Sequence, residues 1–185
     1  MSEERTPLLV LGLGNVLLED DGVGAAAVSL LLDRYDVPPE ARVLDGGTLG
    51  LSLLPCLEGA DAVILVDAVR ADLAPGTFVR LDGDAVPPAV AGRLSPHQVG
   101  VADLLDGARW LGRYPRRLVL VGLVPASMDL AVGLSPAVRA SLPELVERIA
   151  GEARALGVVF RPKTAGTEPA VGPHVDVARL ARGQP

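Results

Sequence analysis

Three side chains in this sequence have the chemistry to bind a divalent metal ion together: Asp21, Asp67 and His97. Each lies just beyond the end of an apolar segment or at the start of the helical segment after it. Two carboxylates and one imidazole form a mixed oxygen and nitrogen ligand set, which suits zinc, nickel and similar divalent ions. Three protein ligands also leave coordination positions open for water or another molecule. These residues are therefore a candidate metal site.

Each of the three residues also has an ordinary structural explanation. Asp21 could cap the helix after it, Asp67 could belong to a turn at a strand end, and His97 could be a hydrogen-bonded loop residue. The spacings are long and match no short metal-binding motif. The second histidine, His174, lies in a segment without periodicity. His97 is therefore the better candidate ligand.

The segment that leads to the first candidate acid predicts a buried strand, a tight turn and a helix. Residues 8–11 form a short apolar run, which is typical of a strand buried on both faces. Gly12 and Gly14 permit a tight exit and a close backbone approach. The acids at 19–21 fall where a helix over 22–35 begins, and there they can cap its N–H groups.

Apolar runs and helical periodicity alternate along the rest of the chain. They predict strands over 41–45, 61–69, 76–81 and 117–125, and helices over 49–57, 99–111 and 136–156. Because 76–81 follows the preceding strand too closely for a crossover helix, one antiparallel strand is expected. The predicted fold is a single three-layer α/β/α domain with a mainly parallel twisted sheet. The carboxyl ends of parallel strands share one edge, so the three candidate ligands should converge there.

Proline and glycine mark the segments that we expect to be less regular. Residues 46–48 are predicted to be a loop, and the proline-rich segment 85–92 is predicted to be irregular. Pro143 is expected in the first turn of the longer part of the last helix, where proline is tolerated. From residue 161 onward there is no periodicity, so the domain is assigned to 1–160 and 161–185 to a loosely ordered C-terminal tail.

Composition excludes several classes of partner and location. The net charge of −6 and the pI near 4.9 argue against nucleic acid or an anionic membrane as partner. No apolar run approaches the ~20 residues of a membrane-spanning helix, and the polar, acidic N-terminus does not resemble a signal peptide. Cys56 is the single cysteine, so it forms no internal disulfide, which fits the reducing cytoplasm.

Two other kinds of active site fit the residues poorly. The segment 12–17 resembles a dinucleotide-binding fingerprint but lacks its third glycine, and the acids at 19–21 would repel a pyrophosphate. The residues around Ser95 do not match a nucleophile elbow, so they do not support a serine hydrolase. Cys56 lies within an apolar helical stretch, as expected of a small core residue.

Five sequence blocks, taken in order, resemble the [NiFe]-hydrogenase maturation endopeptidase family. They are GLGNVLLEDDGVG at 12–24, DGGT at 45–48, DA at 67–68, SPHQ at 95–98 and LVGLVP at 120–125. The resemblance covers residues 8 to about 156, and the ordered set is far more specific than any one block. It implies a hydrolase that removes the C-terminal extension from the precursor of the hydrogenase large subunit. We found no counterpart in the family for the segment after about residue 160.

The resemblance implies that the family's metal ligands fall on Asp21, Asp67 and His97, the same three residues reached from the strand ends. The position of Asp21 is Glu in some family members and Asp in others. Because Asp is shorter by one methylene, the backbone has to bring its carboxylate within reach of the metal. Asp20, its neighbour, is the alternative ligand.

The resemblance also implies a substrate-binding segment made of Asp45, Gly46, Gly47 and Thr48. Its glycines permit the backbone mobility that such a role needs.

The resemblance implies that the metal is nickel already placed in the precursor and held there by cysteine thiolates, so that the contact is transient. Another divalent ion could occupy the isolated protein. Since no serine or cysteine nucleophile accompanies the triple, water is the expected attacking group. Either Asp67 or Asp21 would act as general base, or the metal would polarise the carbonyl.

Two other functions stay open at this point. One is a non-catalytic chaperone of the nickel-loaded large subunit. The other is a general metallopeptidase with its own zinc, which a site with one histidine makes less favourable. For the endopeptidase we expect a cytoplasmic monomer.

Overall fold

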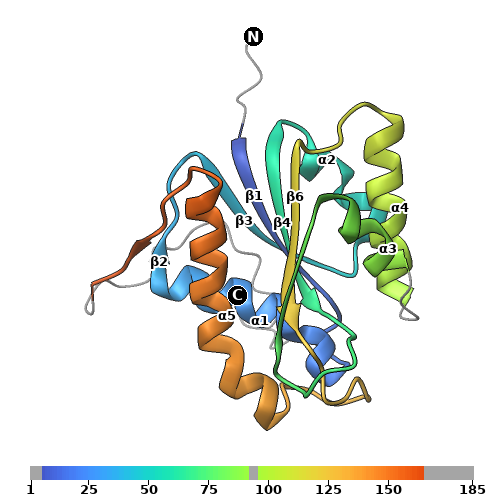
Figure 1. Ribbon diagram of the computed structural model, residues 1–185, viewed down its shortest axis with the longest axis vertical. Coiled ribbons are helices and arrows are strands. Elements are labelled where there is room, and N and C mark those ends of the chain that lie inside the picture. Colours follow the sequence, from blue (N-terminus) through green and yellow to red (C-terminus); the bar gives the residue numbers. More distant parts are fainter. Residues whose placement is uncertain (1–5, 92–95, 165–185) are drawn as a thin grey trace, which may run out of the picture.

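A five-stranded sheet forms the centre of the computed structural model, which describes residues 6–91 and 96–164 (Figure 1). In spatial order its strands are β3 (Ala41–Gly47), β1 (Thr6–Leu13), β4 (Ala60–Ala68), β6 (Arg117–Leu123) and β5 (Phe78–Asp82). The first four are parallel, and β5 runs antiparallel to β6 at the edge. The predicted sheet, with its one antiparallel strand, is confirmed.

Helices cover both faces of this sheet (Figure 1). On one face lie α1 (Val23–Arg34) and α5 (Pro136–Ala155). On the other lie α2 (Leu54–Leu57), α3 (Val86–Ala91) and α4 (Pro96–Trp110). Alternate side chains of β1 enter the two cores, since Leu8 and Val10 pack beneath α1 and Leu9 and Leu11 pack on the opposite side. Burial on both faces explains why this strand reads as a continuous apolar run.

Short elements complete the described part of the chain. They are the 3-10 turns η1 (Glu19–Gly22), η2 (Gly50–Leu53) and η3 (Gly83–Ala85), and the strands β2 (Tyr35–Asp36) and β7 (Arg161–Pro162). β2 and β7 form an antiparallel pair beside the end of α1. Lys163 strengthens this contact, because its Nζ donates to the Leu32 carbonyl at 2.6 Å. The predicted tail thus begins with a paired strand; its remainder, 165–185, lies outside the described residues.

The edge strand β5 is attached to α5 by a network of charges. Arg80 Nε donates to Glu152 Oε1 at 2.6 Å, and Arg80 Nη2 donates to Asp82 Oδ2 at 3.0 Å. Hydrogen bonds to Glu152 and Asp82 raise the pKa of Arg80 above its usual range. The side chain of Arg80 is 39% exposed, and the network holds the helix over the sheet edge.

The structure corrects three sequence predictions. The segment 85–92 is not irregular, because α3 includes Pro87 and Pro88 in its first turn, where proline removes no helical hydrogen bond. The predicted loop at 46–48 is wrong for its first two residues, since β3 continues to Gly47 opposite Leu13. The predicted helix over 49–57 is divided into η2 and α2, with Pro55 in the first turn of α2.

The position of Pro143 is a fourth correction. The predicted helix over 136–156 is confirmed as α5, but it is one continuous helix, and Pro143 lies in its interior rather than in a first turn. Ser135 caps this helix through its Oγ, which accepts a hydrogen bond from the Val138 N–H at 3.4 Å. Pro143 therefore removes an interior hydrogen bond to the Arg139 carbonyl and crowds it.

We predict that Pro143→Ala stabilises the protein. An interior proline costs about 3 kcal/mol relative to alanine, of which the more flexible unfolded chain of the variant offsets about 1 kcal/mol. The free energy of unfolding in urea should therefore rise by about 2 kcal/mol. Pro136→Ala, at the first helical position, is the control and should gain far less. A loss of stability in Pro143→Ala would contradict the prediction.

Candidate active site at the carboxyl edge of the sheet

Asp21 and Asp67 meet at the carboxyl ends of two neighbouring strands. Asp67 is the next-to-last residue of β4, and Asp21 lies in η1, which follows β1. Gly14 lies between them, since a Cβ at this glycine would overlap the Asp21 carbonyl oxygen and lie 3.7 Å from Asp67 Oδ1. The structure therefore brings together two of the three predicted ligands, at the predicted edge.

Both carboxylates are buried and held by backbone hydrogen bonds. Asp21 is 0% exposed and Asp67 is 1% exposed. Asp21 Oδ2 accepts from the Asn15 N–H at 2.8 Å, and Asp67 Oδ1 accepts from the Ala68 N–H at 2.7 Å. Burying an acid in this way is costly and is rare unless the carboxylate is paired, hydrogen-bonded or bound to a metal. The pair is therefore the strongest chemical feature of this edge.

Neither Asp20 nor Asp21 caps α1. The N-cap of this helix is Gly22, which provides no side-chain hydrogen bond. Asp21 instead reaches back to Asn15, in the turn after β1. The capping explanation drawn from the sequence is therefore wrong for both acids.

Asp20 anchors a distant loop. Its Oδ1 accepts from the Ser135 N–H at 2.7 Å, and its Oδ2 accepts from the N–H groups of Ala126 at 2.8 Å and Ser127 at 3.3 Å. These bonds use both oxygens and aim the carboxylate at the loop between β6 and α5. The geometry therefore assigns Asp20 a structural role and does not favour it as the alternative ligand.

The same loop is joined to the turn after β1 through backbone bonds. The Glu19 N–H donates to the Ala131 carbonyl at 2.8 Å, and the Ala131 N–H donates to the Leu17 carbonyl at 3.1 Å. Glu19 has a φ of +44°, which strains a non-glycine residue. Together with Asp20, these contacts hold a strained turn next to the buried acids.

His97 lies in the first turn of α4, which begins at Pro96, three residues before the predicted helix. Its side chain lies outside the described residues, so the proposed third ligand stays a prediction. α4 packs against η2, where a Cβ at Gly50 would lie 2.9 Å from the Gly100 Cα. Because η2 follows β3, the start of α4 also lies toward the carboxyl edge. Among the side chains that the structure describes, no three of His, Cys, Asp and Glu are grouped closely enough to hold a metal.

The predicted substrate-binding segment lies at the end of β3. Asp45 is exposed, and its Oδ1 accepts from the Gly47 N–H at 3.0 Å, which closes a small turn. Gly47 has a φ of +46°, a conformation that favours glycine. Gly46 is buried against Leu11 and Leu53, so the outer residues of the segment, Asp45 and Thr48, are the accessible ones.

Comparison with known proteins identifies the family. A family model described as hydrogenase maturation protease matches residues 25–152. The chain belongs to this family. The family resemblance and the endopeptidase class expected from the sequence are therefore confirmed, and the protein is a protease of hydrogenase maturation. The E. coli (strain K12) hydrogenase 2 maturation protease is 39% identical over 159 residues, which is 85% of this chain and 97% of that protein.

The solved structure of hydrogenase maturating endopeptidase HybD from E. coli has the same fold as this hydrogenase maturation protease. Its TM-score is 0.81 at 39% identity, and the match covers 84% of this chain and 97% of that one. The HupD protein of Rhodobacter capsulatus is 37% identical over 180 residues, or 96% of this chain and 86% of that protein. Such a match leaves few residues of this chain uncovered, so it extends into 161–185, for which the sequence had indicated no family counterpart.

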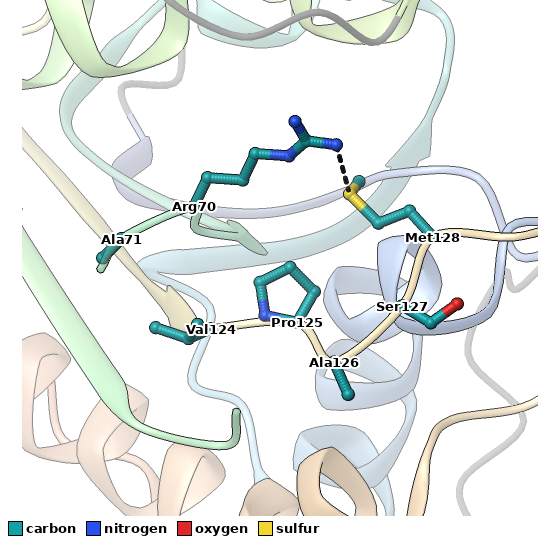
Figure 2. Close-up of a pocket in the computed structure, with 7 residues that line it drawn as sticks. All are labelled: Arg70, Ala71, Val124, Pro125, Ala126, Ser127 and Met128. Atoms are coloured by element: carbon teal, nitrogen blue, oxygen red, sulfur yellow. Dashed lines mark hydrogen bonds between the residues drawn. The ribbon is translucent and has the colours of Figure 1, made fainter. Parts of the chain in front are cut away.

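Two features of this protease were not predicted from the sequence. The anchoring role of Asp20 depends on residues more than a hundred positions away. A pocket between the ends of β4 and β6, lined by Arg70 and by residues 124–128, depends equally on the fold (Figure 2). The block at 120–125 was the one signal that pointed toward it. Within the described residues, no helix combines the length and the apolar character needed to cross a membrane.

Replacing Asp20 with alanine should destabilise the fold and release the loop after β6. Three backbone N–H groups would lose their acceptor, and each costs about 1–3 kcal/mol when left buried without one. We expect the free energy of unfolding to fall by about 3 kcal/mol and amide exchange at Ser135 to accelerate. Asp20→Asn, which keeps one acceptor oxygen, should lose less. Equal amide exchange in wild type and Asp20→Ala would show that the loop does not depend on this carboxylate.

Proposed function

We propose that this protein removes the C-terminal extension from the precursor of a [NiFe]-hydrogenase large subunit, and that it does so after nickel has been inserted. The family assignment supports a protease of hydrogenase maturation. The observation that carries the finer proposal is the pair of buried acids, Asp21 and Asp67, on either side of Gly14. The metal belongs to the substrate, and its contact with the protease is transient.

The donor set fits nickel at this position. Asp21 and Asp67 supply carboxylate oxygens, and His97, in the first turn of α4, would supply an imidazole nitrogen. Such oxygen and nitrogen ligands are compatible with nickel and with neighbouring divalent ions. Cys56 contributes no thiolate here, because it packs against the apolar cluster beneath α2. A resident zinc would be expected to have more nitrogen or sulfur ligands. When bound, nickel would supply positive charge at the point of docking.

The protein's own acids would handle the protons of peptide hydrolysis. An attacking water loses a proton, and the departing amide nitrogen gains one. We propose that one of the two carboxylates accepts the first proton and returns it to the leaving group. Asp67 is well suited, because the Ala68 N–H fixes the direction of its Oδ1. The low exposure of both acids keeps bulk water from competing for these protons.

The surface around the acids supports a protein as substrate. Large apolar side chains are exposed in the loops that follow β1, β3, β4 and β6, with Leu130 at 83% and Val132 at 84%. Because the loops after parallel strands share one edge of the sheet, these side chains gather at that edge, as apolar side chains do at protein interaction sites. Within the described residues, the large apolar side chains exposed in these loops are Val16, Leu17, Leu49, Leu51, Leu73, Leu130 and Val132. The single cysteine favours a reducing compartment, and we therefore propose that processing takes place in the cytoplasm.

The decisive experiment compares the precursor with and without nickel. Each form is mixed with the protein, and its intact mass is followed. We expect loss of a C-terminal peptide from the nickel-loaded precursor alone. Cleavage of both forms would refute nickel recognition, and binding without any change in mass would indicate a chaperone.

Variants of the proposed ligands should block this processing. Asp67→Asn, Asp21→Ala and His97→Ala should each slow cleavage of nickel-loaded precursor by about a hundredfold or more, as expected for loss of a proton-transfer or ligand group. Asp106→Asn, an exposed acid on α4, is the matched control and should be unaffected. Circular dichroism has to show that the variants fold. Processing at the wild-type rate by a folded Asp67→Asn would remove this residue from the mechanism.

Asp45 should affect substrate binding rather than the chemical step. Its exposed carboxylate lies at the end of β3, and we propose that it contacts the precursor. Asp45→Asn removes the charge while keeping an oxygen that can accept from the Gly47 N–H. We expect KM to rise about tenfold with kcat nearly unchanged, since a charged hydrogen bond is worth roughly 1.5–3 kcal/mol. An unchanged KM would show that the precursor does not use this group.

A further inference from the structure

A pocket of about 230 Å³ lies beside the buried acids, between the ends of β4 and β6 (Figure 2). Val124, Pro125 and Ala126 line it with apolar surface. Figure 2 shows the Arg70 and Met128 side chains pointing toward each other across from Pro125, with Arg70 Nη2 3.8 Å from Met128 Sδ. Sites for whole small molecules usually measure roughly 300–1,000 Å³. This volume therefore suits one side chain of a larger ligand.

The walls of the pocket are fixed before any ligand binds. The Val69 N–H donates to the Leu123 carbonyl at 2.9 Å, and the Val124 N–H donates to the Thr77 carbonyl at 2.9 Å. On the opposite wall, Ala126 and Ser127 donate their N–H groups to Asp20. Three backbone donors of the lining are therefore already used, and the one charged group among the lining residues is the Arg70 guanidinium.

Arg70 carries a charge that the described part of the chain does not neutralise. It is exposed and forms no ion pair with any described residue, in contrast to Arg80 and Arg148, which pair with acids. Its hydrogen bond to Met128 uses one of five donors, and a thioether is a weak acceptor. A guanidinium in this state is suited to bind a carboxylate through two parallel hydrogen bonds.

We propose that this pocket is a substrate subsite. In this assignment an apolar side chain of the precursor enters between Val124 and Met128, and a carboxylate near it in the same polypeptide binds Arg70. The assignment rests on the proposed function and adds a sequence preference to it. Acids elsewhere on this edge, Asp45 among them, repel a carboxylate, so the Arg70 pocket is the favourable place for one. The carboxylate is either an Asp or Glu side chain or the C-terminus of the precursor.

The test measures the kinetics of processing with nickel-loaded precursor. Arg70→Gln should raise KM about tenfold and Arg70→Glu still more, with kcat within about twofold of wild type. The effect should shrink at high salt because a charge pair is lost. Arg117→Gln, at the amino end of β6, removes an exposed arginine from the opposite edge and should leave KM unchanged. Ala126→Leu fills the pocket without touching the charge and should also raise KM.

Altered precursors identify the source of the carboxylate. One has the acidic side chains of its extension changed to amides, and another has an amidated C-terminus. When the altered precursor lacks the carboxylate that Arg70 binds, KM should rise for the wild-type protease. KM for the Arg70→Gln protease should not change, as in a double-mutant cycle. An unchanged KM for Arg70→Glu, or no coupling with either precursor, would overturn the subsite. Failure of the wild-type protease to process any precursor would overturn the proposed function itself.

Discussion

The close approach of the η1 turn and the start of α1 to the ends of β1 and β4 determines where both buried acids lie. A Cβ at Gly12 would lie 2.5 Å from the Gly24 carbonyl oxygen, and one at Gly14 would overlap the Asp21 carbonyl oxygen. Backbone contacts this short leave no room for any side chain at these positions. They bring the backbone of Asp21 next to the end of β4, where Asp67 lies. Without the glycines, the same acids would be separated by a layer of side chains.

The sheet and the meeting of Asp21 with Asp67 could be predicted because both depend on regular features. Strands buried on both faces read as apolar runs, and the ends of parallel strands share one edge. The separate roles of Asp20 and Asp21 could not be predicted in this way. Adjacent residues of a 3-10 turn point in different directions, and the partners of Asp20 lie in the loop after β6. The helix over 86–91 was missed because prolines in a first turn resemble those of a loop.

The Arg70 pocket could not be predicted from the sequence for a related reason. Its two walls come from residues 70–71 and 124–128, and they meet because β4 and β6 are neighbours in the sheet. A lone arginine after a strand is ordinary in sequence. What makes Arg70 informative is that it lines a pocket and lacks an acidic partner within the described chain. Both properties depend on the tertiary structure, whereas the sequence shows only the positive charge of Arg70.

The order of strands places opposite charges on either side of the buried acids. Asp45 lies near the end of β3, Asp21 follows β1, and Asp67 is the next-to-last residue of β4. Arg70 follows β4 and lines the pocket between the ends of β4 and β6. A polypeptide that crosses this edge therefore passes from a negative to a positive group. If the precursor contacts both ends, this asymmetry gives the bound chain a preferred direction, because the reversed orientation would bring its acid against Asp45. Direction matters to a protease that cuts one bond, since only one orientation presents the scissile amide to the same carboxylate.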